Sequence, residues 1–332
     1  MTIEKMPLAL EVDRLSVEFQ TEDVTAKAID DVSFSVGKGE TLALVGESGS
    51  GKSVTARAVM GLVGDPGRVT NGTIRIGGDD VSRYSPRQWR AIRGARIAMV
   101  FQDSLSALNP VFTVGQQLVE SFRVHKGIRG SAARKRAIEL LELVRIPDAE
   151  QRFHQYPHEF SGGMRQRAMI AMSIALEPEV LIADEPTTAL DVTVQAQILD
   201  LLADLQRERQ MGLVLITHDL GIVAQRADRV AVMYSGRIVE ETVTRKLFGS
   251  PSHGYTTALL GAIPRIDTSI GALTTIPGRP PQLGRQGRGC SFAPRCEFAV
   301  AACRDEIPEP IEVDRGHIAA CHEWERVRDE SK

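Results

Sequence analysis

Eight consecutive residues combine glycines, hydroxyls and one lysine in a spacing suited to phosphate binding. They are Gly46-Glu47-Ser48-Gly49-Ser50-Gly51-Lys52-Ser53, a full match to G-x-x-x-x-G-K-[ST]. Gly49 and Gly51 let backbone N–H groups turn toward phosphate oxygens, and the helix that follows adds partial positive charge. Lys52 suits the β- and γ-phosphates, and the Ser53 hydroxyl suits Mg²⁺. The segment predicts a nucleotide-binding loop, although a Gly/Ser-rich turn before a helix is the plainer interpretation.

Two adjacent carboxylates follow the apolar run 180–183. They are Asp184 and Glu185. The carboxyl ends of parallel strands face the ligand crevice, so Asp184 is expected to hold Mg²⁺ through water and Glu185 to polarise an attacking water. Taken alone, the pair is equally well interpreted as a solvated strand end. The phosphate loop favours the catalytic interpretation.

A third segment, Ser161-Gly162-Gly163-Met164-Arg165-Gln166-Arg167, has the composition of a glycine-bearing helix N-terminus. Such a terminus attracts anions. Ser161 also has the side chain of an N-cap.

The elements around these motifs follow an α/β pattern. Residues 41–45 form a continuous apolar run, typical of a central buried strand, and a helix is predicted over about 52–63. Further strands are predicted at 15–19, 32–36, 96–101, 180–183, 213–217 and 229–233, the last leading through Tyr234-Ser235-Gly236 into a hairpin. Helical periodicity dominates from about 103 to 161, with Ser131 as an expected N-cap, and returns after Asp191.

Composition restricts the class of protein. The chain has 332 residues, 42% hydrophobic content and a net charge of −3, which favour a globular protein and give no sign of nucleic-acid binding. Apolar runs are strand-length, and residues 1–5 lack the apolar core of a signal peptide. We therefore expect a cytosolic protein whose membrane association is peripheral, through partner proteins.

The tail after residue 250 differs from the rest. It is rich in proline with little regular periodicity, and it holds the four cysteines, spaced C-x₅-C-x₆-C-x₁₇-C: Cys290, Cys296, Cys303 and Cys321. In a cytosolic chain such clustering favours a metal or cluster site over disulfides. Four thiolates suit a [4Fe–4S] cluster or Zn²⁺, and buried or free thiols remain a third interpretation. Arg295 is expected either to offset cluster charge or to be solvated.

Together these residues resemble the ATP-binding subunits of ABC transporters. The order of motifs matches: phosphate loop, Gln102, Ser161-Gly162-Gly163, Asp184-Glu185, Asp191 and His218. The resemblance implies a P-loop NTPase with a RecA-like core, an antiparallel β subdomain and a helical subdomain at about 103–164. It implies a nucleotide-binding domain over 1–250 and a cysteine-containing extension over 251–332.

The resemblance also implies roles for single residues. Phe19 would stack on adenine, Gln102 would link Mg²⁺ and the attacking water to the membrane domain, and His218 would contact the γ-phosphate. Ser161, Gly162 and Gly163 would bind ATP held by a partner subunit, and Asp191 would communicate across the dimer. Phe19 as ordinary core, Gln102 as a surface amide and His218 as an exposed histidine are the plainer interpretations. The signature departs from the family's Leu-Ser-Gly-Gly-Gln, since Phe160 precedes Ser161 and Met164 follows Gly163.

The motif 100–103, the segment 186–195 and the tail motifs around 253–256 and 276–281 resemble the oligopeptide/dipeptide/nickel import group. That implies a second ATPase subunit (more often a paralogue), two membrane permease subunits, an extracytoplasmic solute-binding protein, and a location on the cytoplasmic face of the inner membrane. Some members of the group hold a [4Fe–4S] cluster on the same four cysteines. Peptide is the expected cargo, with nickel or another small solute as the alternative. A soluble ABC ATPase of DNA repair or translation, or a regulatory module without turnover, fits the sequence less well.

Overall fold

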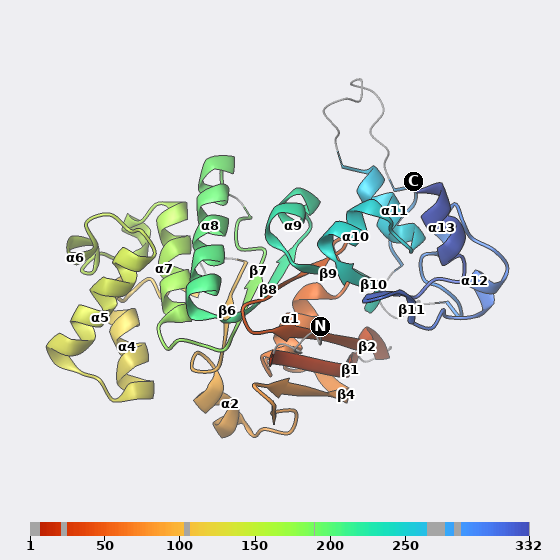
Figure 1. Ribbon diagram of the computed structural model, residues 1–332. Coiled ribbons are helices and arrows are strands. Elements are labelled where there is room, and N and C mark those ends of the chain that lie inside the picture. Colours follow the sequence, from red (N-terminus) through yellow and green to blue (C-terminus); the bar gives the residue numbers. More distant parts are fainter. Residues whose placement is uncertain are drawn as a thin grey trace. The chain divides into compact units, whose positions relative to one another are not determined.

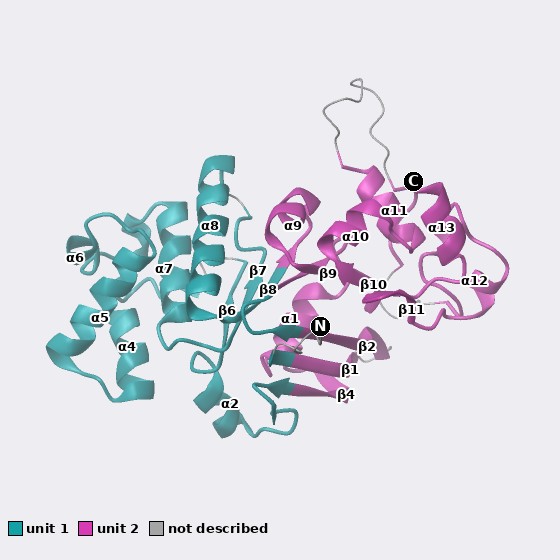
Figure 2. Ribbon diagram, viewed as in Figure 1, with its two compact units in different colours: residues 1–10, 36–40, 75–215 teal, residues 11–35, 41–74, 216–332 magenta. Residues whose placement is uncertain are grey.

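The computed structural model describes residues 7–20, 25–102, 107–188, 190–263, 276–281 and 287–331. Residues 1–5, Asp103 and Ala189, which the sequence interpretation used, lie outside this range. The chain divides into two compact units (Figure 2): unit 1 comprises residues 1–10, 36–40 and 75–215, and unit 2 comprises 11–35, 41–74 and 216–332. The division of the chain at residue 250 stays a prediction.

Unit 1 contains buried parallel strands. β6 (Ile97–Val100) pairs in parallel with β7 (Val180–Asp184), Ile97 opposite Val180, and β8 (Gly212–Thr217) lies on the other side of β7. Every residue of β6 and β7 is buried, because these runs are apolar on both faces. The short strand β5 (Asp79–Asp80) pairs antiparallel with the end of β4 (Gly67–Ile76).

The helices of unit 1 pack beside these strands (Figure 1). Helix α7 contacts β6, α4, α5 and α8. Their bounds are α2 Pro86–Ile92, α4 Val114–Lys126, α5 Gly130–Leu143, α6 Ala149–Arg152, a 3₁₀ turn Pro157–Glu159, α7 Gly162–Ile174 and α8 Val192–Arg209. The prediction of Ser131 as an N-cap is wrong, since α5 already begins at Gly130 and its cap position, Arg129, makes no side-chain capping bond. The preceding helix, α4, does have a side-chain cap: the side chain of each of Thr113 and Gln116 accepts a hydrogen bond from the backbone of the other.

The strands of unit 2 include most of β1 (Leu8–Gln20), β2 (Thr25–Gly37) and β4, in the order β2-β1-β4. A second set runs β11-β12-β10-β9-β3, in which β3 (Thr41–Val45) pairs in parallel with β9 (Arg229–Tyr234). The predicted hairpin is confirmed: β9 turns into β10 (Arg237–Val243) through Ser235 and Gly236, both at positive φ.

The tail contributes more regular structure than the sequence predicted. β11 (Ile311–Asp314) and β12 (His317–Ala319) form an antiparallel pair, and β12 pairs with β10. The sequence does not predict the hairpin of β11 and β12 because both strands are short. The helices of unit 2 are α1 Lys52–Val59, α9 Leu220–Arg226, α10 Thr244–Gly249, α11 Gly254–Gly261, a 3₁₀ turn Ala293–Arg295, α12 Ala302–Asp305 and α13 Trp324–Glu330. α1 ends four residues before the predicted Val63.

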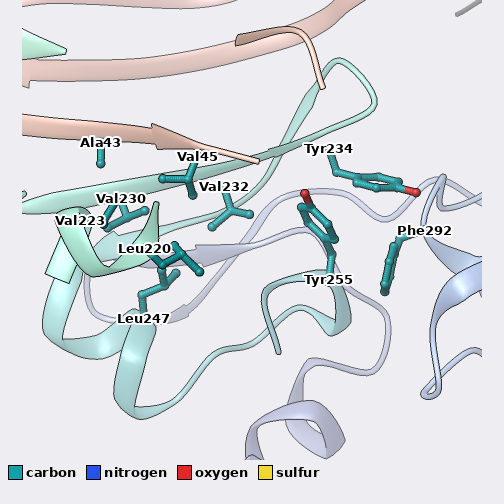
Figure 3. Close-up of a cluster of buried hydrophobic side chains, with 10 residues drawn as sticks. All are labelled: Ala43, Val45, Leu220, Val223, Val230, Val232, Tyr234, Leu247, Tyr255 and Phe292. Carbon is teal, nitrogen blue, oxygen red and sulfur yellow. The ribbon is translucent and has the colours of Figure 1, made fainter. Parts of the chain in front are cut away.

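A hydrophobic core joins the tail to strands β3 and β9 of unit 2 (Figure 3). Side chains from β3, β9, α9 and α10 pack together with Tyr255 of α11 and Phe292 of the tail. Tyr255 is fully buried and Phe292 is 1% exposed. Tyr234, Tyr255 and Phe292 contact one another, with ring centroids 4.5–5.3 Å apart. The tail is therefore built into the core of unit 2.

Candidate functional site

The phosphate loop connects β3 to α1, and its backbone needs glycine. Gly46 has φ +153°, and a Cβ there would lie 2.2 Å from the carbonyl oxygen of Met233. Gly51 has φ +107°, and its Cβ would lie 2.9 Å from the carbonyl oxygen of Ala28. Both neighbours are backbone atoms that cannot yield, so larger residues would distort the loop. The predicted strand–loop–helix unit is confirmed.

Lys52 places its ammonium group inside this loop. Its Nζ donates to the carbonyl oxygens of Gly46 (2.7 Å) and Glu47 (2.9 Å) and to the Ser50 hydroxyl (3.3 Å). The residue is 6% exposed and stands at the first position of α1, with Ser53 half-buried beside it. A fixed cation at a helix N-terminus is an arrangement that binds phosphate.

Phe19 lies near the end of β1 and is half-buried. Its ring lies against Gly67, where a Cβ would come within 2.7 Å of Phe19 Cε1. The Phe19 ring is therefore packed against the backbone at Gly67. Its stacking on adenine stays a prediction.

In unit 1 the structure brings Gln102 and Glu185 together. Gln102 Nε2 donates to Glu185 Oε2 at 2.9 Å. Asp184 is the last residue of β7 and is 4% exposed, whereas Glu185 is half-buried with φ +45°. Thr188 Oγ1 also donates to Glu185 Oε2, at 2.9 Å. The sequence interpretation missed Thr188, although a hydroxyl three residues after a carboxylate in a turn is a recognisable signal.

The signature segment and Asp191 begin neighbouring helices. Ser161 caps α7, its Oγ accepting from the Met164 amide at 3.3 Å, and Asp191 caps α8, accepting from the Val194 amide at 2.9 Å. A Cβ at Gly163 would lie 2.7 Å from Val194 Cγ1, so this glycine lets the two helix starts approach. The expected role of Ser161 as an N-cap is confirmed.

His218 follows the end of β8 in an exposed position. The next residue, Asp219, caps α9 by accepting from the amides of Gly221 (2.8 Å) and Ile222 (3.2 Å). The carboxylate of Asp219 thus fixes the turn that carries His218. Its contact with a γ-phosphate stays a prediction.

The four cysteines line one small cavity of about 10 Å³, together with His253, Phe292 and Phe298. Backbone amides donate to the sulfurs: Phe298 to Cys296, and Gly254 and Glu323 to Cys321. Burial nevertheless raises the pKa of Cys296 to about 11 and that of Cys321 to about 12, so these thiols are protonated near neutral pH when no metal is bound.

Within the ranges that the structure describes, no group of three or more His, Cys, Asp or Glu side chains is arranged to hold a metal ion. The cysteines thus converge on a common space without forming a mononuclear metal site. The alternative that Arg295 is solvated is wrong, because its guanidinium is buried and bonds to Glu47 of the phosphate loop. That Arg295 offsets cluster charge stays a prediction. No helix among the described residues is long and apolar enough to cross a membrane.

Comparison with known proteins agrees with this architecture. The family described as ABC transporter matches residues 29–188, and the family described as oligopeptide/dipeptide transporter, C-terminal region, matches residues 239–303. A putative peptide import ATP-binding protein of Brucella abortus is 52% identical over 94% of this chain and 93% of its own length. The dipeptide transport ATP-binding protein DppD of Bacillus subtilis is 49% identical over 95% of each chain.

Among solved structures, the ATP-binding cassette MJ0796 bound to ADP and phosphate is 26% identical, with a TM-score of 0.64 over 71% of this chain and 99% of that one. The match confirms the P-loop ABC fold. With relatives about half identical over nearly the whole chain and both family regions present, this chain belongs to the ATP-binding subunits of ABC transporters, in the oligopeptide/dipeptide transporter family.

Proposed function

We propose that this chain hydrolyses ATP to power the import of peptides through a membrane permease. The observation that carries the ATPase proposal is the loop at 46–53, closed around the ammonium group of Lys52. Peptide as cargo is supported by the two relatives, which are named for peptide import and dipeptide transport.

In the proposed reaction, Lys52 holds the β- and γ-phosphates. Ser53, Asp184 and Gln102 are the residues that would hold Mg²⁺, which would offset the charge of the phosphates. Glu185 orients the attacking water and accepts its proton as the oxygen attacks the γ-phosphorus. The bond to the bridging oxygen then breaks, and ADP leaves with the electron pair. The hydrogen bonds from Gln102 and Thr188 support this assignment, because both fix the Glu185 carboxylate. His218 contacts the γ-phosphate, and Phe19 stacks on adenine.

The site is completed by a second ATPase subunit. Ser161, Gly162 and Gly163 reach the γ-phosphate held by that partner, and Asp191 communicates across the dimer. Donors at a helix N-terminus stabilise the transition-state charge once water is excluded. Two permease subunits and an extracytoplasmic solute-binding protein complete the importer, with this chain peripheral at the cytoplasmic face of the membrane.

The four cysteines are proposed to hold a [4Fe–4S] cluster. The donor chemistry fits: four thiols line one cavity, and amides point at the sulfurs of Cys296 and Cys321, an arrangement that stabilises thiolates. A cavity of about 10 Å³ is only large enough for a water molecule, so the sulfurs must separate to admit a cluster. When bound, the cluster would cross-link the tail.

A single zinc ion needs all four sulfurs within about 2.3 Å of one point. No such arrangement is present among the described residues, so zinc, the alternative, would also require the sulfurs to move. Anaerobically purified protein is expected to contain iron and sulfide near four each per chain. Stoichiometric zinc, or neither metal, would exclude the cluster.

The importer proposal is tested on the assembled complex in lipid vesicles. We expect ATP hydrolysis to rise when the solute-binding protein carries a dipeptide, and to be abolished in the Lys52→Ala variant. Stimulation by Ni²⁺ instead of dipeptide would identify the alternative cargo. Turnover that needs no membrane subunit and rises with nucleic acid would point to a non-transport ABC ATPase.

A further inference from the structure

The phosphate loop carries an acidic side chain directly after its first glycine. Glu47 follows Gly46, and a carboxylate at this point opposes the binding of an anionic triphosphate. Arg295 of the tail binds both of its oxygens: Nη1 donates to Oε2 at 2.7 Å and Nη2 to Oε1 at 3.0 Å. Such a bidentate pair is among the strongest charge-assisted contacts and neutralises the carboxylate where it stands.

Arg295 is held by its surroundings as well. Its side chain is 5% exposed, against 25% for that of Glu47. Nη1 also donates to the Tyr234 hydroxyl at 3.1 Å, and Nε to the carbonyl oxygen of Pro277 at 2.7 Å. The guanidinium lies 5.9 Å from the centre of the Tyr234 ring and 5.7 Å from that of Phe292. The cation is therefore fixed in place before any ligand arrives.

A second tail residue binds the backbone of the same acidic residue. The Glu47 amide donates to the hydroxyl of Tyr255 at 2.7 Å. Tyr255 follows Gly254, whose amide donates to Cys321 and whose Cα faces the sulfur of Cys296, so that a Cβ there would lie 2.6 Å from that sulfur. Arg295 itself immediately precedes Cys296. Both contacts to Glu47 thus come from residues adjacent to the cysteine cavity.

We propose that Arg295 is a positioning residue for ATP binding, which neutralises Glu47 so that the phosphate loop can accept the triphosphate. This inference rests on the proposed ATPase function and extends it: ATP affinity depends on the order of the cysteine-containing tail. By linkage, nucleotide binding stabilises the tail to the same extent.

The test is a double-mutant cycle on the full-length chain, measuring the dissociation constant of a non-hydrolysable ATP analogue with Mg²⁺. Arg295→Gln leaves Glu47 charged and unneutralised, and is expected to weaken binding about tenfold, within the range usual for coupled sites. Glu47→Gln removes the charge and keeps an oxygen that can accept from Arg295, so binding is expected within about threefold of wild type. The double variant is expected to bind like Glu47→Gln.

A role as a mere structural tether gives a different pattern. If Arg295 acted only as a structural tether, its loss would weaken binding whether residue 47 is Glu or Gln, and the double variant would be no better than Arg295→Gln. That pattern, or unchanged binding by Arg295→Gln, overturns the proposal. Raising the salt concentration should narrow the gap between Arg295→Gln and wild type, because Glu47 is partly solvated and its repulsion is screened. A gap that does not change with salt argues for the tether.

Two further variants make the test robust. Arg326→Gln removes an exposed arginine of the same tail that pairs with Glu330, and should bind the analogue like wild type. Weakening equal to that of Arg295→Gln would mean a general effect of tail destabilisation and would refute the specific role. If Arg295→Gln unfolds at the assay temperature, Glu47→Ala decides, because it removes both the charge and the contact with Arg295. Binding near that of wild type supports charge neutralisation, and tenfold weakening overturns it. Failure of the folded wild-type chain to bind nucleotide would instead refute the proposed function on which the inference rests.

Discussion

Glu185→Gln separates the chemistry of Glu185 from its contacts. Glu185 Oε2 accepts hydrogen bonds from Gln102 Nε2 and Thr188 Oγ1, both at 2.9 Å. The glutamine carbonyl oxygen can take the place of Oε2 and accept the same two bonds. The substitution therefore preserves these two hydrogen bonds and removes the negative charge and the ability to accept a proton.

The expected magnitude follows from that difference. Loss of a general base slows a reaction by about 10²- to 10⁴-fold, which is about 2.7–5.4 kcal/mol in activation free energy. Because the contacts persist, the ATP dissociation constant is expected to stay within about threefold of wild type. Thr188→Val serves as a control: it removes one hydrogen bond, worth about 0.5–1.5 kcal/mol, and keeps the carboxylate. Its turnover should fall by no more than about tenfold.

The assay is ATP turnover by the assembled importer, with nucleotide binding measured on the same samples. If Glu185→Gln hydrolyses ATP at the wild-type rate, the residue is not the general base. If binding and turnover fall together, the side chain supports the structure of the site and its proposed chemical role is refuted.

Three other predictions concern the tail. Tyr255→Phe removes the acceptor of the Glu47 amide and should lower the free energy of unfolding by about 1–3 kcal/mol in urea titrations; an unchanged midpoint would mean that water replaces the hydroxyl. Burial lowers the pKa of His253 to about 4 from 6.5, so between these values the unfolded chain binds a proton that the folded chain does not. Stability should fall by about 3 kcal/mol as pH drops through that window, and His253→Asn should flatten the dependence. Gly254→Ala drives a methyl group toward Cys296 and should cost about 1–3 kcal/mol, whereas Gly249→Ala, with no atom within 4 Å of the added Cβ, should be neutral in the same thermal unfolding assay.

The elements around the phosphate loop could be predicted because their signals are local. The apolar run 41–45, the glycines and the first turn of α1 are all encoded within about twenty residues, and β3 and α1 form there. The hairpin could likewise be predicted from the adjacent residues Ser235 and Gly236, which both adopt positive φ in its turn. The ends of helices were predicted less accurately than their presence. Helix α1 ends at Val59 because Met60 caps it and Gly61 adopts φ +63°.

What the sequence could not indicate was long-range partnership. Glu47 and Arg295 are 248 residues apart, and nothing in either neighbourhood marks them as a pair. His317 and Glu240 are also buried together, 2.8 Å apart, although each would be expected at the surface by residue type. Arg295 looked like a residue of the cysteine site because of its neighbour in sequence, whereas the fold turns its side chain to the phosphate loop. Such contacts depend on the tertiary path of the chain.

Because β3 pairs with β9, the phosphate loop is synthesised long before the segments that complete its surroundings. The ribosome releases the phosphate loop early, but Met233, which closes over Gly46, and Arg295, which binds Glu47, come much later. At about 5–20 residues per second, roughly 12–50 s separate the synthesis of Glu47 from that of Arg295. During this interval the nascent chain has the nucleotide motif without the residues that shape and neutralise it. A chain cut short before residue 295 would therefore keep the nucleotide motif but lack the guanidinium that binds Glu47.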